Sequence, residues 1–193
     1  MKSYLFAAVA AAALALAACG QKTEEQAATP PTEQSANAIT PLEATVDPAA
    51  KTLEFATKAA NADMIEIESS KAAAGKTTNA EVKKLANMLV KDHTATSKEL
   101  KDWASKTTVT LPAALDGMDK GKVDNIVNAD ANGFDDKYLD TIIDVHEDAI
   151  NAFNDYINNG QEANLKAWAT ATLPKLQAHL DAAKALRDRI NKT

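Results

Sequence analysis

The side chains of this protein best suited to chemistry are its three histidines, His93, His146 and His179, together with Glu66. Each falls on the apolar stripe of a separate amphipathic helical pattern, so all four are expected to face inward. Neutral imidazole and carboxylate groups bind Zn, Fe, Cu or Mn, and helical bundles build metal sites from inward side chains on facing helices. Glu66, His93, His146 and His179 are therefore candidate ligands of one transition-metal ion.

A histidine that binds a metal needs a hydrogen-bond acceptor for its other ring nitrogen. Asp92, Asp144 and Glu147 stand close to the histidines in the sequence and are the candidates for this second role. Neighbours along a helix point in different directions, so proximity in the sequence does not by itself bring these carboxylates to the imidazoles.

The same residues have a second interpretation, in which they bind no metal. Glu66 and Asp92 would then hydrogen-bond to histidines, and the buried polar network would select one packing arrangement. Counting residues from the predicted turns, at about 1.5 Å per residue, separates Glu66 and His93 in height by roughly 7 Å. The same count separates His146 and His179 by roughly 6–8 Å. Both interpretations stay open on these estimates.

The sequence argues against several classes of enzyme. A di-iron carboxylate bundle needs Glu-x-x-His motifs, but Val90, Ile143 and Leu176 stand three residues before the histidines. There is also no Gly-x-Ser-x-Gly nucleophile motif, no phosphate-binding glycine loop and no His-Glu-x-x-His zinc motif. A net charge of −6 argues against nucleic-acid binding, which depends on a basic surface. The composition thus favours a non-catalytic binding role.

Four long helical patterns position the candidate residues. They are predicted at about 49–74, 80–105, 134–157 and 165–190, with a shorter and more polar helical segment at 113–127. Gly75 is expected to stop the first helix, and Pro174 is expected to kink the last. Two helical hairpins joined by a longer connection predict an all-α, up-and-down four-helix bundle with a short extra helical segment between the second and third helices.

The N-terminal residues resemble a bacterial lipoprotein leader. A short basic start is followed by an apolar run over residues 4–16 and by Leu16-Ala17-Ala18-Cys19, which resembles a lipobox. We predict a signal peptide at 1–18, a lipidated Cys19 followed by a disordered tether at 19–47, and a folded domain at 48–193. Gly20, where an Asp would signal retention, indicates by resemblance to bacterial sorting rules an anchor in the outer membrane, facing the periplasm.

Most of the folded region also resembles the bacterial DUF4142 family. The matching pieces are Phe55-x6-Ala62-x3-Glu66-Ile67, Val90-x-Asp92-His93, Val109-Thr-Leu-Pro112, Phe134-Asp135-x2-Tyr138-x7-His146 and Leu173-Pro174-x-Leu176-x2-His179-Leu180. The resemblance implies a ferritin-like helical bundle associated with the outer membrane, and it supplies no reaction.

Two functional hypotheses follow. The first is a membrane-anchored periplasmic lipoprotein whose non-catalytic helical bundle has a binding or envelope-associated role that the sequence does not specify, with envelope proteins as candidate partners. The alternative is a transition-metal-binding protein that uses Glu66 and the three inward histidines.

Overall fold

The computed structural model describes residues 48–192. The predicted signal peptide, the lipidation of Cys19 and the tether therefore lie outside the described residues.

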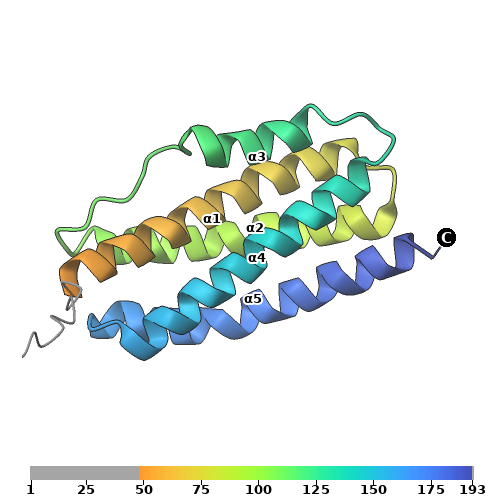
Figure 1. The fold of residues 1–193 in the computed structure, drawn as a ribbon. Helices are drawn as coiled ribbons and strands as arrows, with labels where there is room; N and C mark the ends of the chain where they lie inside the picture. The colour runs from red at the N-terminus through yellow and green to blue at the C-terminus, as the bar shows by residue number, and fades with distance from the viewer. Residues whose placement is uncertain (1–47, 193) are drawn as a thin grey trace, which may run out of the picture. The chain divides into compact units, whose positions relative to one another are not determined.

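Five helices make up this region, and the described residues contain no strand, which confirms the all-α prediction (Figure 1). Their bounds are α1 (Pro48–Lys76), α2 (Ala80–Ala104), α3 (Gly117–Val127), α4 (Phe134–Asn159) and α5 (Ala163–Ile190). None of them combines the length and apolar character that crossing a bilayer requires, as far as the described residues go.

Two helix boundaries differ from the sequence prediction. Helix α1 does not stop at Gly75 but continues to Lys76. The chain then turns before α2, whose first turn is capped by the Asn79 side chain, which accepts hydrogen bonds from two backbone N–H groups. Helix α3 starts at Gly117 rather than 113, because the Asp116 side chain caps it in the same way. Helix α5 continues through Pro174 without ending.

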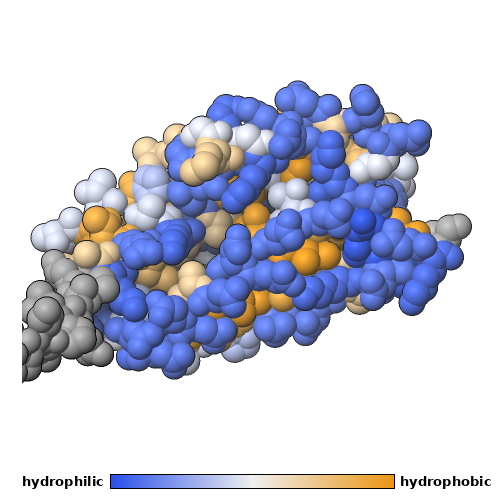
Figure 2. All heavy atoms as spheres, viewed as in Figure 1, coloured by the Kyte–Doolittle hydropathy of each residue, from blue (hydrophilic) through white to orange (hydrophobic). Residues whose placement is uncertain are grey.

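The four long helices pack in pairs, α1 with α2 and α4 with α5. The pairs meet where α1 packs on α4 and α2 on α5, and α3 lies over α1 and α4 (Figure 1). The face of this region seen in Figure 2 is largely hydrophilic, with apolar residues visible in the seams between helices. The paired helices thus enclose a core along their shared length.

Besides a small cluster that includes Val123 of α3, two larger apolar clusters fill that core. One contains Leu89 of α2 and Ile142 of α4, and the other contains Leu100 of α2 and Phe153 of α4. His93 lies between the two cluster positions of α2, so a polar layer separates the two apolar clusters. Packing in the two apolar clusters sets how the helices are aligned along their length, so it positions the polar side chains between the clusters.

Gly160 gives a direct test of the packing at one end of the core. A Cβ atom there would lie 2.5 Å from the Tyr156 carbonyl oxygen and 2.6 Å from the Tyr156 ring. That ring stacks on Phe55 with 4.2 Å between the ring centroids, and the Tyr156 hydroxyl shares a 3.0 Å hydrogen bond with the Thr52 hydroxyl. We expect Gly160→Ala to lower the free energy of unfolding by about 1–3 kcal/mol. The matched control, Gly121→Ala within α3, meets no atom within 4 Å and should raise it by about 0.5–1 kcal/mol. Urea denaturation of both variants measures the difference; equal effects would contradict this packing.

Candidate metal centre

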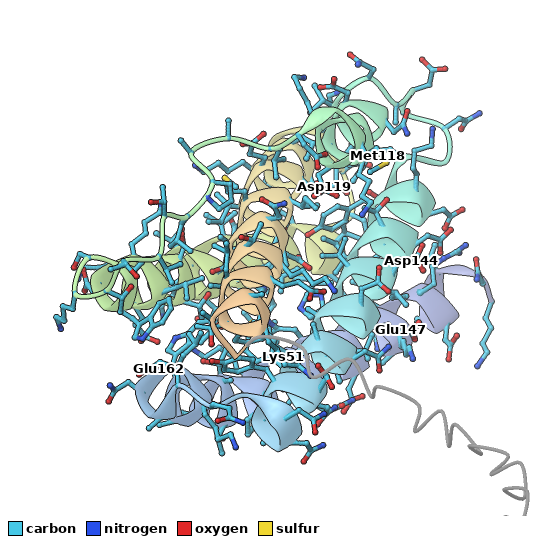
Figure 3. All side chains as sticks on the ribbon, turned by 60° about the vertical axis from the view of Figure 1, so that its left-hand side comes forward. Lys51, Met118, Asp119, Asp144, Glu147 and Glu162 are labelled. Atoms are coloured by element: carbon cyan, nitrogen blue, oxygen red, sulfur yellow. The ribbon has the colours of Figure 1, made fainter. Side chains whose placement is uncertain are left out.

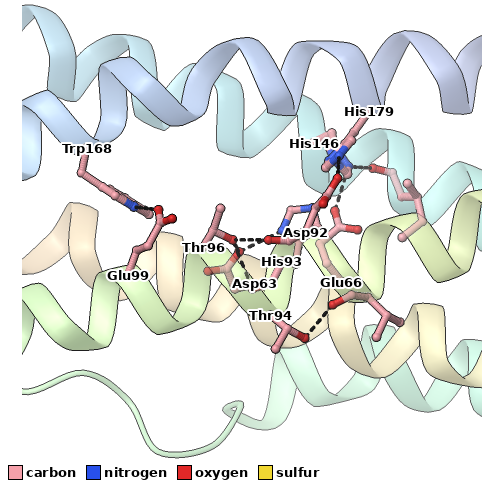
Figure 4. Close-up of polar contacts among 12 residues, drawn as sticks. Asp63, Glu66, Asp92, His93, Thr94, Thr96, Glu99, His146, Trp168 and His179 are labelled. Carbon is pink, nitrogen blue, oxygen red and sulfur yellow. Dashed lines mark hydrogen bonds and ion pairs between the residues drawn. The ribbon is translucent and has the colours of Figure 1, made fainter.

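The three histidines meet at the centre of the polar layer, one each from α2, α4 and α5 (Figure 4). The ring centroids of His93 and His146 are 5.4 Å apart, those of His93 and His179 are 5.2 Å apart, and those of His146 and His179 are 5.4 Å apart. All three residues are at most 3% exposed. The height differences estimated from the sequence are therefore absorbed by the packing, and the imidazoles form one compact cluster.

Each imidazole has a hydrogen-bond partner on one ring nitrogen. His93 Nδ1 lies 2.8 Å from Asp63 Oδ1, to which the Thr96 hydroxyl also donates at 2.8 Å. His179 Nε2 lies 3.1 Å from an Asp92 carboxylate oxygen. With the carboxylates ionised, these contacts place the proton of each neutral ring on the nitrogen that faces the carboxylate.

His146 Nδ1 has two acceptors within reach, the Ile142 carbonyl at 2.9 Å and Glu66 Oε1 at 2.8 Å. A single N–H cannot point at both, and only the Ile142 contact has hydrogen-bond geometry, since neither Glu66 oxygen has a hydrogen-bond partner among the described residues. Glu66 therefore acts on His146 mainly through its charge. The Ile142 bond leaves the Nε2 atom of the neutral ring without a proton.

The remaining ring nitrogens have no hydrogen-bond partner among residues 48–192. These are Nε2 of His93, Nε2 of His146 and Nδ1 of His179, each buried. One nitrogen from each ring lies within 4.8 Å of the corresponding nitrogens of the other two. Each ring thus has one buried nitrogen free to bind an ion, while its other nitrogen is held by a carboxylate or a carbonyl. This donor set fits a metal ion, because histidine ligands are oriented in this way.

The local electrostatics keep two of the rings neutral. Burial lowers the pKa of His93 to about 4 and that of His179 to about 4, so both are uncharged at neutral pH. Burial also raises the pKa of Asp63 to about 7, against the effect of the Thr96 hydrogen bond. Burial by itself lowers the pKa of His146. The charge of Glu66 and the Ile142 carbonyl outweigh that effect and raise the pKa of His146 above its ordinary value.

The charge of Glu66 can be tested through its effect on His146. We expect Glu66→Gln to lower the pKa of His146, because the substitution removes the carboxylate that raises it while keeping the shape of the side chain. Titration of the His146 ring signals by NMR, in metal-free protein, measures the change. Glu147→Gln is the control, since Glu147 adjoins His146 in α4 but is exposed and pairs with Lys184 at 2.6 Å. A His146 pKa unchanged by Glu66→Gln would refute this assignment.

The structure brings together most of the residues predicted as ligands or partners, but not all. Glu66 joins the cluster beside His146 Nδ1 rather than among the converging nitrogens, and Asp92 contacts His179. Asp144 and Glu147 do not serve the histidines, which corrects the sequence prediction. Both are exposed on the outer side of α4 (Figure 3), because their positions on the helix turn them away from the core.

Sequence reasoning missed Asp63, the partner of His93. Asp63 stands three residues before Glu66, and residues at that spacing share one face of a helix. It is 5% exposed, so it faces inward with Glu66. The three-residue spacing between Asp63 and Glu66 could therefore have predicted that Asp63 faces the histidines.

The described region is thus an all-helical protein domain with a buried cluster of three histidines. The chain belongs to the DUF4142 family, a domain of unknown function, whose model matches residues 28–186. No curated protein matches the chain.

Among solved structures, the chain is similar to CopM in its Cu(I)-bound form, with 18% sequence identity and a TM-score of 0.59, covering 70% of this chain and 94% of CopM. It is also similar to CopM in the Cu(II)-bound form, with 18% identity and a TM-score of 0.61, covering 71% of this chain and 95% of CopM. At this identity the likeness establishes a shared fold.

Proposed function

We propose that this protein binds one transition-metal ion, with copper as the first candidate, through His93, His146 and His179. Two observations carry the proposal: one nitrogen from each of the three buried rings lies within 4.8 Å of one nitrogen of each other ring, and each ring has one nitrogen without a hydrogen-bond partner among the described residues. A single ion placed among them would satisfy all three lone pairs.

A purely structural polar network explains the site less well. In such a network the buried groups are expected to satisfy one another, and each unsatisfied buried group costs about 1–3 kcal/mol. Here one nitrogen of each ring has a hydrogen-bond partner, and the other has none among the described residues. The pattern of contacts is that of histidines oriented toward an ion, with Asp63, Asp92 and the Ile142 carbonyl as the orienting groups.

The donor set favours copper over harder metals. Three imidazoles suit copper or zinc, and the divalent first-row ions bind nitrogen sites most tightly at Cu²⁺. Copper in both oxidation states is named for the similar structure, CopM. We assign Glu66 the role of a nearby negative charge that offsets the charge of the ion, because its carboxylate lies against His146 Nδ1.

We infer a non-catalytic role in holding or transferring the ion. The Glu-x-x-His motifs of di-iron bundles do not occur in the chain. The histidine site is also closely packed, because all three histidines are buried. These features support binding of an ion rather than turnover of a substrate.

The test of this function is the metal content of the untagged, purified protein after incubation with Cu, Zn, Fe or Mn in turn and removal of excess metal. We expect about one equivalent of copper per chain at neutral pH. Retention of no metal would overturn the proposal, and the histidines would then serve only the packing of the core.

We further propose that Cys19 anchors the domain to the outer membrane on the periplasmic side, as the leader sequence indicates. Cys19→Ala is then expected to move the protein from the membrane fraction to the soluble periplasmic fraction, because the acyl chains that hold it are lost. Fractionation of cells expressing each form measures this change, with Ser35→Ala in the tether as the control. Membrane association that survives Cys19→Ala would contradict the anchor.

A further inference from the structure

We propose that the metal reaches the histidines from the groove between α1 and α4, through a thin wall in which Phe153 is the movable part. This inference rests on the proposed metal function and adds the route by which the buried site exchanges its ion.

The groove is open to solvent and has a volume of about 550 Å³. It lies along α1 and α4, and residues of α3 border it. Phe55, Ile65 and Val145 contribute apolar side chains to its lining. The groove is therefore large enough to admit a hydrated ion deep between the helices.

The charged rim of the groove favours a cation. It carries four carboxylates, Glu54, Asp119, Asp148 and Asp155, against three lysines. The lysines form ion pairs with Glu54, Asp119 and Asp155. Asp148 is exposed and has no ion pair among the described residues, so the rim carries a net negative charge. A negative mouth raises the local concentration of cations.

A second, much smaller cavity adjoins the histidines. Its volume is about 10 Å³, and Asp63, Glu66, His93 and His146 are among the residues that line it. This is close to the space that one water molecule occupies. The cavity thus reaches two of the three proposed ligands.

The groove and the cavity share a wall. Ala59, Ala62, Ala149 and Phe153 line both of them. The alanines contribute only methyl groups, so the separation is thin, and no side-chain hydrogen bond must break to open it. Phe153 has the only large side chain of these four residues. Its ring centroid lies 5.0 Å from that of Phe55 and 5.4 Å from that of Trp168. Rotation of the Phe153 ring away from the wall joins the groove to the cavity.

The route predicts a kinetic effect without a change in affinity, because a barrier on the path slows entry and release by the same factor. We expect Ala149→Leu, which thickens the wall, to slow both uptake of Cu²⁺ and its release to excess EDTA at least tenfold, with an unchanged equilibrium affinity. Phe153→Leu thins the wall and should accelerate both steps. Ala152→Leu is the matched control, since Ala152 lines the groove but not the cavity. Stopped-flow measurement of tryptophan fluorescence follows both steps, because Trp168 lines the cavity.

The outcomes separate the route from the function. If wild-type protein binds one equivalent of copper but neither Ala149→Leu nor Phe153→Leu changes the two rates, the route is wrong and the metal site stands. The route would also be overturned if Ala152→Leu changed the two rates as much as Ala149→Leu does. The same holds if Ala149→Leu changed the equilibrium affinity instead of slowing uptake and release by the same factor. If wild-type protein retains no copper at equilibrium, the proposed function fails first and the route fails with it.

Discussion

Replacing His93, His146 or His179 by alanine is expected to lower copper affinity at least ~100-fold in each case. Loss of an orienting group around a metal typically costs about 10–100-fold, and loss of a ligand should exceed that. Because the chain has only these three histidines, no other histidine replaces the one removed. Competition with a chelator of known affinity measures the change, and all three variants should lose the same ion.

Two further variants sharpen this result. Asp63→Asn keeps the size of the side chain but weakens the acceptor of His93, so we expect an intermediate loss of about 10–100-fold. Asp144→Asn changes an exposed carboxylate of α4 and should leave affinity unchanged. Copper binding that survives in any histidine variant at wild-type strength would remove that residue from the ligand set.

Copper is expected to stabilise the folded protein strongly. At a free copper concentration 1,000 times the dissociation constant, binding to the native state alone adds about 4 kcal/mol to the free energy of unfolding. For a domain of this size, that gain corresponds to a rise in melting temperature of roughly 8–16 °C. Thermal unfolding followed by circular dichroism, with and without copper, measures the shift.

Two controls test whether the stabilisation comes from copper bound at the histidine cluster. At the same copper concentration, a 100-fold loss of affinity in His146→Ala should cut the gain from about 4 to about 1.4 kcal/mol, and a larger loss should cut it further. Magnesium should produce no rise in the wild type, because imidazole nitrogen is a poor ligand for it. A copper-induced rise of wild-type size in His146→Ala would show that the ion binds elsewhere on the protein.

Helical periodicity predicted the all-helical fold and the inward orientation of the three histidines, because the apolar stripe around each residue fixes the face of its helix. It could not predict how closely the rings meet. Counting residues from the turns gave height differences of roughly 6–8 Å at 1.5 Å per residue, whereas the ring centroids of His146 and His179 are 5.4 Å apart. Helix tilt, side-chain length and side-chain direction close that gap, and none of them is visible in a sequence.

The partners of the histidines were harder to predict than the histidines themselves. Asp92 was identified and contacts His179, but Asp63 reaches His93 from another helix, 30 positions away in the sequence. Asp144 and Glu147 were selected for closeness in sequence to His146, but both are exposed on the outer side of α4. Contacts between helices depend on the packing of the whole domain, whereas the face of a single helix depends on local spacing.

The most direct test of the metal centre is a crystal structure of the copper-loaded protein, with anomalous scattering measured at the copper edge. The account predicts one strong peak between His93 Nε2, His146 Nε2 and His179 Nδ1, at roughly 2 Å from each nitrogen. A peak bound by surface carboxylates, or density that leaves these three nitrogens unliganded, would contradict it.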